Sequence, residues 1–202
     1  MSPEPRGYPQ PVLEGNDGHA GTGQRLARQS AARTIFVLFL VAPLPWVIVY
    51  FLPPINHDAA ALLHFASRWL AGERLYVDLV DINPPLIFVL NLIPAAIDRL
   101  TPINGPTALT LCTLGWIAIG FALFWRLLDT RVEPAGSLRR YLMPPLMLFL
   151  MIAYPGTEFA QREQLMIVAA LPYLLLAEAR MTGTSVPRRL MIATALFAGF
   201  GY

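Results

Sequence analysis

The stretch INHDAAALLHFASRWLAGERLYVDLVDINPPL, residues 55–86, directly follows the apolar run TIFVLFLVAPLPWVIVYFL, residues 34–52. That run is close to the roughly 20 residues that a helix needs to cross a bilayer. The stretch behind it carries charge at Asp58, Arg68, Glu73, Arg74, Asp78 and Asp81. Because charge is costly within lipid, such a cluster at the end of an apolar run indicates a surface beside the membrane where polar groups are handled.

The composition of the whole chain agrees with a membrane protein. Hydrophobic residues make up 55% and charged residues 14%, with a mean hydropathy of +0.51. An ordinary soluble domain carries about 25% charged residues. The net charge of +2 gives no reason to expect nucleic acid as a partner. The single cysteine, Cys112, excludes a disulfide within the chain.

The arginines indicate which apolar runs cross. Further apolar runs lie at about residues 86–97, 108–128, 141–154, 165–179 and 190–202. Arginines flank the first run and fill the connections near residues 126–140 and 180–189, and positive flanks stay in the cytoplasm. These three groups of arginines lie on the same side of the membrane only if residues 86–97 do not cross it. That run has only about 12 residues, against the roughly 20 needed, and contains Pro94. We therefore expect a re-entrant or interfacial helix there.

The sequence thus predicts an all-α, multi-pass transmembrane helical bundle of about five spans, with interfacial helices in the first outer loop. Residues 1–32, rich in Pro, Gly, Gln and Arg, are expected to be a disordered cytoplasmic tail. Residues 33–202 form the transmembrane part, with outer loops at 53–106 and 155–164. The run 141–154 is the weakest candidate, because it is short for a span.

The residues after Asp58 have the period of an amphipathic helix, which Gly72 ends. One face gathers the apolar residues Ala59, Leu62, Leu63, Phe65, Ala66, Trp69 and Leu70, and the other holds Ala61, His64, Ser67 and Arg68. We expect this helix to lie flat in the membrane interface, with Trp69 at the headgroup level. Asp58 stands at its N-terminus, where Asp is also a favoured cap.

The pattern A-G-E-R-L-Y-V-D-L-V-D-I-N-P-P-L, after a membrane-exit Asp that opens an amphipathic helix, resembles the first outer loop of GT-C glycosyltransferases. The nearest resemblance is to bacterial members of the protein O-mannosyltransferase and aminoarabinose-transferase type. The second outer loop of many such proteins is similar to G-Q-R-E-H-L. Here the corresponding residues are Ala160, Gln161, Arg162, Glu163, Gln164 and Leu165, so Ala replaces the common Gly and Gln the common His.

This resemblance, over about residues 33–202, implies a sugar transfer from a polyprenyl-phosphate donor at the outer face of the bacterial plasma membrane. It implies Asp58 as the base that takes the acceptor's proton. Arg162 is a candidate for the phosphate, because a guanidinium binds phosphate in a bidentate fork. Glu163 and Glu158 are candidates for a second carboxylate, which binds either the acceptor or a divalent cation such as Mg²⁺ or Mn²⁺.

The resemblance also marks the region of Tyr76 and Asp78, with Asp81 close by, as shaping the substrate loop. The acceptor would be a glycan, a lipid or a protein. Each residue also has a structural alternative: Asp58 as a helix cap, and Arg162 with Glu163 as a local ion pair in a solvated turn.

Two other functions stay open on the sequence alone. One is a non-catalytic membrane protein such as part of a transporter or flippase. Transporters tend to hold charge within spans near the midplane, whereas the charges here lie at the ends of the apolar runs. The other is an inactive fragment, because the chain stops within an apolar run and family members usually have about twice as many spans.

Overall fold

The computed structural model describes residues 30–31, 33–52, 54–130 and 137–201, and these residues form helices without strands. The helices are α2 (Leu44–Val49), α3 (His57–Leu70), α4 (Pro85–Leu100), α5 (Gly105–Asp129), α6 (Leu138–Leu148), α7 (Arg162–Met181) and α8 (Arg188–Gly199). A π-helical turn, Phe149–Ala153, follows α6, and a short 3₁₀ turn, Gly156–Glu158, precedes α7. The predicted all-α class is therefore confirmed. The predicted tail, residues 1–32, lies almost wholly outside the described residues.

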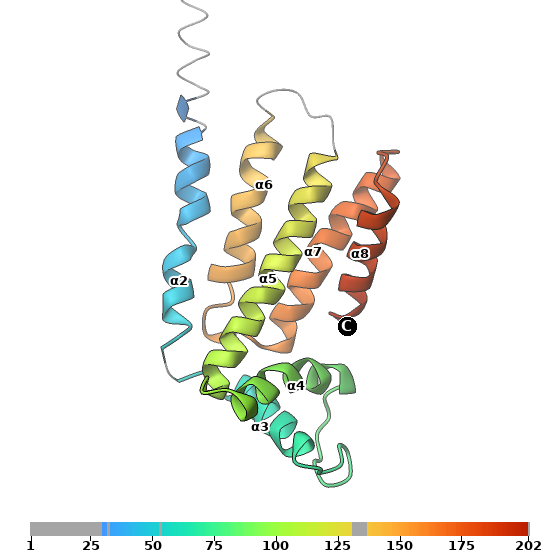
Figure 1. Cartoon of the computed structure of the whole chain (residues 1–202). Coiled ribbons are helices and arrows are strands. Elements are labelled where there is room, and N and C mark those ends of the chain that lie inside the picture. Colours follow the sequence, from blue (N-terminus) through green and yellow to red (C-terminus); the bar gives the residue numbers. More distant parts are fainter. Residues whose placement is uncertain (1–29, 32, 53, 131–136, 202) are drawn as a thin grey trace, which may run out of the picture.

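The long helices α5, α6, α7 and α8 lie side by side with α2, and α3 and α4 lie across one end of this bundle (Figure 1). Two helices, α5 and α7, are long and apolar enough to cross a membrane, and less than half of the most apolar part of each is buried. A shorter apolar helix spans Arg33–Val49, and α2 is its second part. The chain thus has helices suited to a bilayer.

Helices α5 and α7 approach each other closely at Gly120. A Cβ atom at that position would lie 2.9 Å from Val168 Cγ1 and 3.0 Å from the Val168 carbonyl oxygen. Such distances leave no room for a side chain, so glycine lets the two backbones meet. Helices α5 and α7 are therefore in close contact at Gly120 and Val168.

Helix α3 begins and ends where local chemistry dictates. Asn56, not Asp58, is its N-cap, and the Asn56 side chain accepts a hydrogen bond of 2.9 Å from the Asp58 backbone N–H. The expectation of Asp58 as the cap is therefore wrong. Gly72 follows the last turn with φ of +102°, a left-handed conformation that favours glycine.

The apolar face of α3 is the predicted one, but it does not lie against lipid alone. Ala59, Leu62, Leu63 and Ala66 are buried. Leu62 shares a core cluster with Ile87 and Phe88 of α4 and Leu165 of α7. Trp69 is half-buried at the edge of this cluster. The apolar face of α3 thus has protein partners in α4 and α7, and its expected place in the membrane interface stays a prediction.

Helix α4 covers the run at residues 86–97 and has 16 residues. It begins at Pro85, where a missing N–H costs no helix hydrogen bond, and it lies across the bundle end rather than along it (Figure 1). The prediction that this run stays on one side agrees with that placement.

The run at residues 141–154 forms α6 and the π-helical turn. Pro144 and Pro145 lie inside α6, and the Tyr154 N–H donates to the Phe149 carbonyl oxygen at 2.8 Å, five residues back. Proline removes helix hydrogen bonds, so this run is helical but irregular. Whether it crosses a membrane stays a prediction.

The two predicted outer loops lie at one end of the bundle. The first holds α3 and α4, and the second joins the π-helical turn to the start of α7 (Figure 1). The C-terminus of α5, the N-terminus of α6 and the connection between α7 and α8 lie at the opposite end. We call these the polar end and the arginine end. Their separation agrees with the arrangement expected from the arginines, and which side of a membrane each faces stays a prediction.

Candidate functional site

A small hollow at the polar end brings together residues from three distant segments. It has a volume of about 210 Å³. The residues that line it come from the start of α3, the loop before α4 and the start of α7: Asp58, Ala61, Leu62, Asp81, Asn83, Gln161, Arg162 and Glu163. Charged side chains at the same end of a helical bundle are expected to satisfy one another. Asp58 meets Arg162 and Glu163 here, although about a hundred residues separate them.

Asp58 presents its carboxylate to the hollow from the first turn of α3. Its side chain is 62% exposed. Oδ2 accepts a hydrogen bond of 3.3 Å from the Gln161 side-chain amide, and Oδ1 lies 3.2 Å from Nε2 of His57. Since Asn56 serves as the cap, the Asp58 carboxylate is not used by the helix backbone. It is available to a group that enters the hollow.

Arg162 forms the opposite wall from the first turn of α7. One terminal nitrogen donates to Asn83 Oδ1 at 3.1 Å, and the other donates to Glu163 Oε1 at 2.9 Å. Its Nε atom is buried and has no hydrogen-bond partner among the described residues. The N-terminus of α7 adds partial positive charge next to this guanidinium. This part of the hollow suits an anionic group.

Glu163 was predicted as a metal ligand or an acceptor-binding carboxylate. Its side chain is 61% exposed and pairs with Arg162. Within the described part of the chain, no group of three or more His, Cys, Asp or Glu side chains is placed to hold a metal ion. Glu163 pairs with Arg162 through Oε1 alone, and its role as a ligand of a divalent cation stays a prediction.

The loop before α4 supplies a polar bridge that the sequence did not single out. Asp81 Oδ1 accepts hydrogen bonds from the backbone N–H of Asn83 at 2.7 Å and from its side-chain amide at 2.8 Å. This leaves Asn83 Oδ1 facing Arg162. Asp81 therefore lies in the hollow and orients Asn83. The Asn-Pro-Pro motif could have indicated a role for Asn83, because the backbone of a residue before proline is conformationally restricted.

Gln161 is the second residue without an assigned role in the sequence. It forms the N-cap position of α7 and contacts Asp58 through its side-chain amide. The contact joins two segments whose pairing depends on tertiary packing, so local pattern alone gives no signal for it.

Three of the predicted residues lie outside the lining of the hollow. The Asp78 carboxylate accepts hydrogen bonds from the Arg74 side-chain Nε at 3.1 Å and from the Arg74 backbone N–H at 2.8 Å, and these contacts lower the pKa of the Asp78 carboxyl. Tyr76 has a φ of +64° and donates its hydroxyl to the Asn83 carbonyl oxygen. Both shape the loop that carries Asn83, as the resemblance implied for this region.

Glu158 is the third predicted residue that lies outside the lining of the hollow, and it is exposed in the short turn before α7. Its carboxylate accepts a hydrogen bond of 3.3 Å from the hydroxyl of Thr157. Because Glu158 does not line the hollow, the structure does not bring it to Asp58 and Arg162.

The departures at Ala160 and Gln164 have structural consequences. Ala160 has a φ of +68°, in the left-handed region that an Ala occupies only with strain, which explains why Gly is suited to this position. Gln164 is buried and stabilises the same turn. It accepts from the Ala160 N–H at 2.6 Å and donates to the Met151 carbonyl oxygen at 2.8 Å. Gln164 is thus a structural residue facing away from the hollow.

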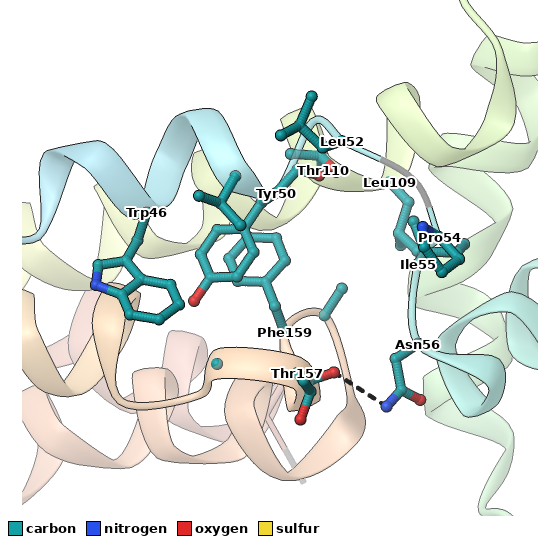
Figure 2. Close-up of a pocket in the computed structure, with 13 residues that line it drawn as sticks. Trp46, Tyr50, Leu52, Pro54, Ile55, Asn56, Leu109, Thr110, Thr157 and Phe159 are labelled. Atoms are coloured by element: carbon teal, nitrogen blue, oxygen red, sulfur yellow. Dashed lines mark hydrogen bonds between the residues drawn. The ribbon is translucent and has the colours of Figure 1, made fainter.

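A second hollow is mostly apolar (Figure 2). Its lining includes Asn56 and Ala160, which are close in the chain to Asp58 and Gln161 of the first hollow. It has a volume of about 270 Å³, and its walls include Trp46, Tyr50, Leu109 and Phe159. The rings of Tyr50 and Phe159 stack with their centroids 3.7 Å apart. At its edge, Asn56 donates to the Thr157 carbonyl oxygen at 3.0 Å, the contact drawn as a dashed line in Figure 2. Asn56 therefore caps α3 and ties it to the second loop.

No protein-family model, curated protein or solved structure matches this chain.

Proposed function

We propose that the chain belongs to a multi-pass membrane glycosyltransferase of the GT-C class. It would move a sugar from a polyprenyl-phosphate donor to an acceptor at the outer face of the plasma membrane. The observation that carries the proposal is the meeting of Asp58 with Arg162 in one hollow. The proposal includes about five spans, with the polar end outside and the arginine end in the cytoplasm.

The reaction would use the two walls of the hollow separately. The acceptor oxygen or nitrogen attacks the anomeric carbon of the sugar, and its proton passes to the Asp58 carboxylate. The bond between the anomeric carbon and the phosphate oxygen breaks, and the phosphate takes the electron pair. Arg162 would then bind the polyprenyl phosphate that leaves. A base within reach of the acceptor and a cation at the leaving group are what this chemistry needs.

The electrostatics of the hollow support this division of roles. The Asp58 side chain is more than half exposed, and among the described residues its polar contacts are Gln161 and His57, so it stays accessible to an acceptor. The Arg162 guanidinium is held in place by Asn83 and Glu163. A charge-assisted bond from this guanidinium to phosphate is stronger than a neutral hydrogen bond.

The dimensions fit only part of the donor. Small-molecule sites usually enclose about 300–1,000 Å³. The polar hollow, at about 210 Å³, suits the phosphate and the reacting end of the sugar. The neighbouring aromatic hollow, at about 270 Å³, would accept the first part of the lipid chain (Figure 2). The rest of the lipid would lie in the bilayer, along the exposed apolar side chains of α2.

The test is sugar transfer with the chain in vesicles that contain a polyprenyl-phosphate-linked sugar and an extract of cell envelopes as the source of acceptor. Release of polyprenyl phosphate is the readout. Asp58→Asn should reduce the rate about 10²–10⁴-fold, as expected for loss of a general base. Asp98 is an exposed residue of α4 that does not line the hollow. Asp98→Asn is therefore the matched control and should leave the rate unchanged. Equal rates for the two variants would refute the role of Asp58.

A further inference from the structure

The arginine end carries a groove of its own, far from the polar hollow. It lies between the C-terminal half of α5 and the start of α8 and has a volume of about 660 Å³. Its wall is formed by Ile119, Leu123 and Leu190, and its rim holds Arg126 and Arg189. The volume lies within the range of small-molecule sites. The proposed sugar transfer makes no use of it.

The two arginines of this rim have no counter-charge of their own. Within the part of the chain that the structure describes, neither Arg126 nor Arg189 forms an ion pair. The one carboxylate in the lining, Asp129, already accepts from Arg140 at 3.1 Å. Two exposed guanidinium groups at one groove therefore favour an anionic ligand.

The ligand must also have an apolar part. Ile119 and Leu123 stand on the same helix as Arg126, and the side chain of Ile119 is 52% exposed. From residue 119 to residue 126 the helix rises about 10 Å, since each residue adds about 1.5 Å. The groove thus changes from apolar to cationic along α5, a helix long and apolar enough to cross a membrane. A phospholipid has the same order, with an acyl chain next to a charged headgroup.

We propose that this groove binds one anionic phospholipid. Its phosphate would contact Arg126 and Arg189 at the headgroup level, and its acyl chain would lie along Ile119, Leu123 and Leu190. Basic pockets between membrane helices bind anionic headgroups in this way. The lipid would pack α5 against the start of α8 at the end of the bundle opposite to the polar hollow.

Lipid binding can be measured on the full chain in a neutral detergent by native mass spectrometry. The probes are phosphatidylglycerol and phosphatidylcholine with the same acyl chains. The wild type should bind phosphatidylglycerol several-fold more tightly than phosphatidylcholine. Each arginine near a charged headgroup contributes about fivefold in affinity, so Arg126→Gln with Arg189→Gln should weaken phosphatidylglycerol binding roughly 25-fold. Phosphatidylcholine binding should not change.

The matched control removes the same charge nearby. Arg180→Gln with Arg188→Gln changes two exposed arginines of the same bundle end that do not line the groove, and should alter phosphatidylglycerol binding less than about fivefold. Arg126→Lys with Arg189→Lys keeps the charge and should retain most of the binding. Equal loss in the two Gln pairs, equal affinity for the two lipids, or displacement of phosphatidylglycerol by excess inorganic phosphate would overturn the proposal. Each of these readouts is independent of sugar transfer.

Discussion

The polar hollow and the groove at the arginine end hold their charged side chains differently. At the polar end, Asp58, Asp81 and Arg162 each contact another polar side chain from a different position in the chain, and together they line one hollow. At the arginine end, Arg126 and Arg189 have no ionic partner among the described residues. A network whose members hold each other is positioned before a ligand arrives. Arginines without an ionic partner instead suit an anionic ligand such as a lipid headgroup.

This difference matches what each side of a bilayer demands. A site for chemistry needs groups fixed in place before the substrate binds. A contact with headgroups needs only positive charge above an apolar wall, because the lipid brings the anion. Under the two proposals, the polar end recognises a substrate and the arginine end contacts membrane lipid.

The side of the membrane on which each end of the bundle lies gives the strongest test of this comparison. In a Cys112→Ala background, single cysteines can replace Val80, which is 81% exposed at the polar end, and Ser185, which is exposed at the arginine end. An impermeant thiol reagent on intact cells should label the cysteine at position 80 and leave the one at position 185 unlabelled, an all-or-none difference. The reverse pattern would place the proposed site in the cytoplasm.

The cap of α3 offers a smaller but well-matched test at the polar end. Asn56→Ala removes a side-chain hydrogen bond to the Asp58 N–H and another to the Thr157 carbonyl oxygen. Loss of an N-cap costs about 0.5–2 kcal/mol of stability, so the thermal unfolding temperature should fall. Asp58→Ala should leave that temperature close to the wild-type value. If Asp58→Ala were the more damaging of the two, the carboxylate would be a structural residue.

Ala160 allows the strain in the second loop to be measured. Its φ of +68° costs an Ala roughly 1–2 kcal/mol, whereas a Gly there loses about 0.5–1 kcal/mol more chain entropy on folding. Ala160→Gly should therefore stabilise the protein by about 0.5 kcal/mol, seen as a higher thermal unfolding temperature. Ala122→Gly, in the regular part of α5, is the control and should destabilise it by about 1 kcal/mol. A lower unfolding temperature for Ala160→Gly would show that the turn is not strained.

The smallest expected effect is the titration of Asp78. Its hydrogen bonds with Arg74 lower the pKa of the carboxyl below its usual range. A group with a lowered folded pKa adds stability above its unfolded pKa of about 3.9, and loses it as the pH falls through the folded value. Carbon NMR of labelled aspartate should show this low pKa, and Arg74→Gln should raise it toward the ordinary value. An unchanged pKa in Arg74→Gln would remove Arg74 as the cause.

Much of the fold follows from local pattern. The period of residues 59–70 defined the buried face of α3, and the short run at residues 86–97 became α4 across the bundle end. Both predictions rest on length and spacing, which a sequence displays directly. The cap of α3 differs from the alternative considered for Asp58 for an equally local reason. Asn56 and Asp58 are both good caps, and the helix starts two residues earlier than a cap at Asp58 would place it.

The site was harder to predict, because its contacts join distant segments. Asp58, Arg162 and Glu163 meet as expected, since charges at the same end of a bundle have few other partners. Asn83 and Gln161 were missed, because their roles depend on which loops pack together. Glu158 and Asp78 were placed by motif alone, and the turn geometry directs them elsewhere.

The central claim is that Arg162 and Asp58 share one polyprenyl-phosphate site but act at different steps. The most direct measurement is equilibrium binding of polyprenyl phosphate, compared with neutral polyprenol, to the chain in vesicles. The wild type should prefer the phosphate, Arg162→Gln should lose that preference, and Asp58→Asn should keep it. A wild type that binds polyprenol as tightly as polyprenyl phosphate would contradict the account.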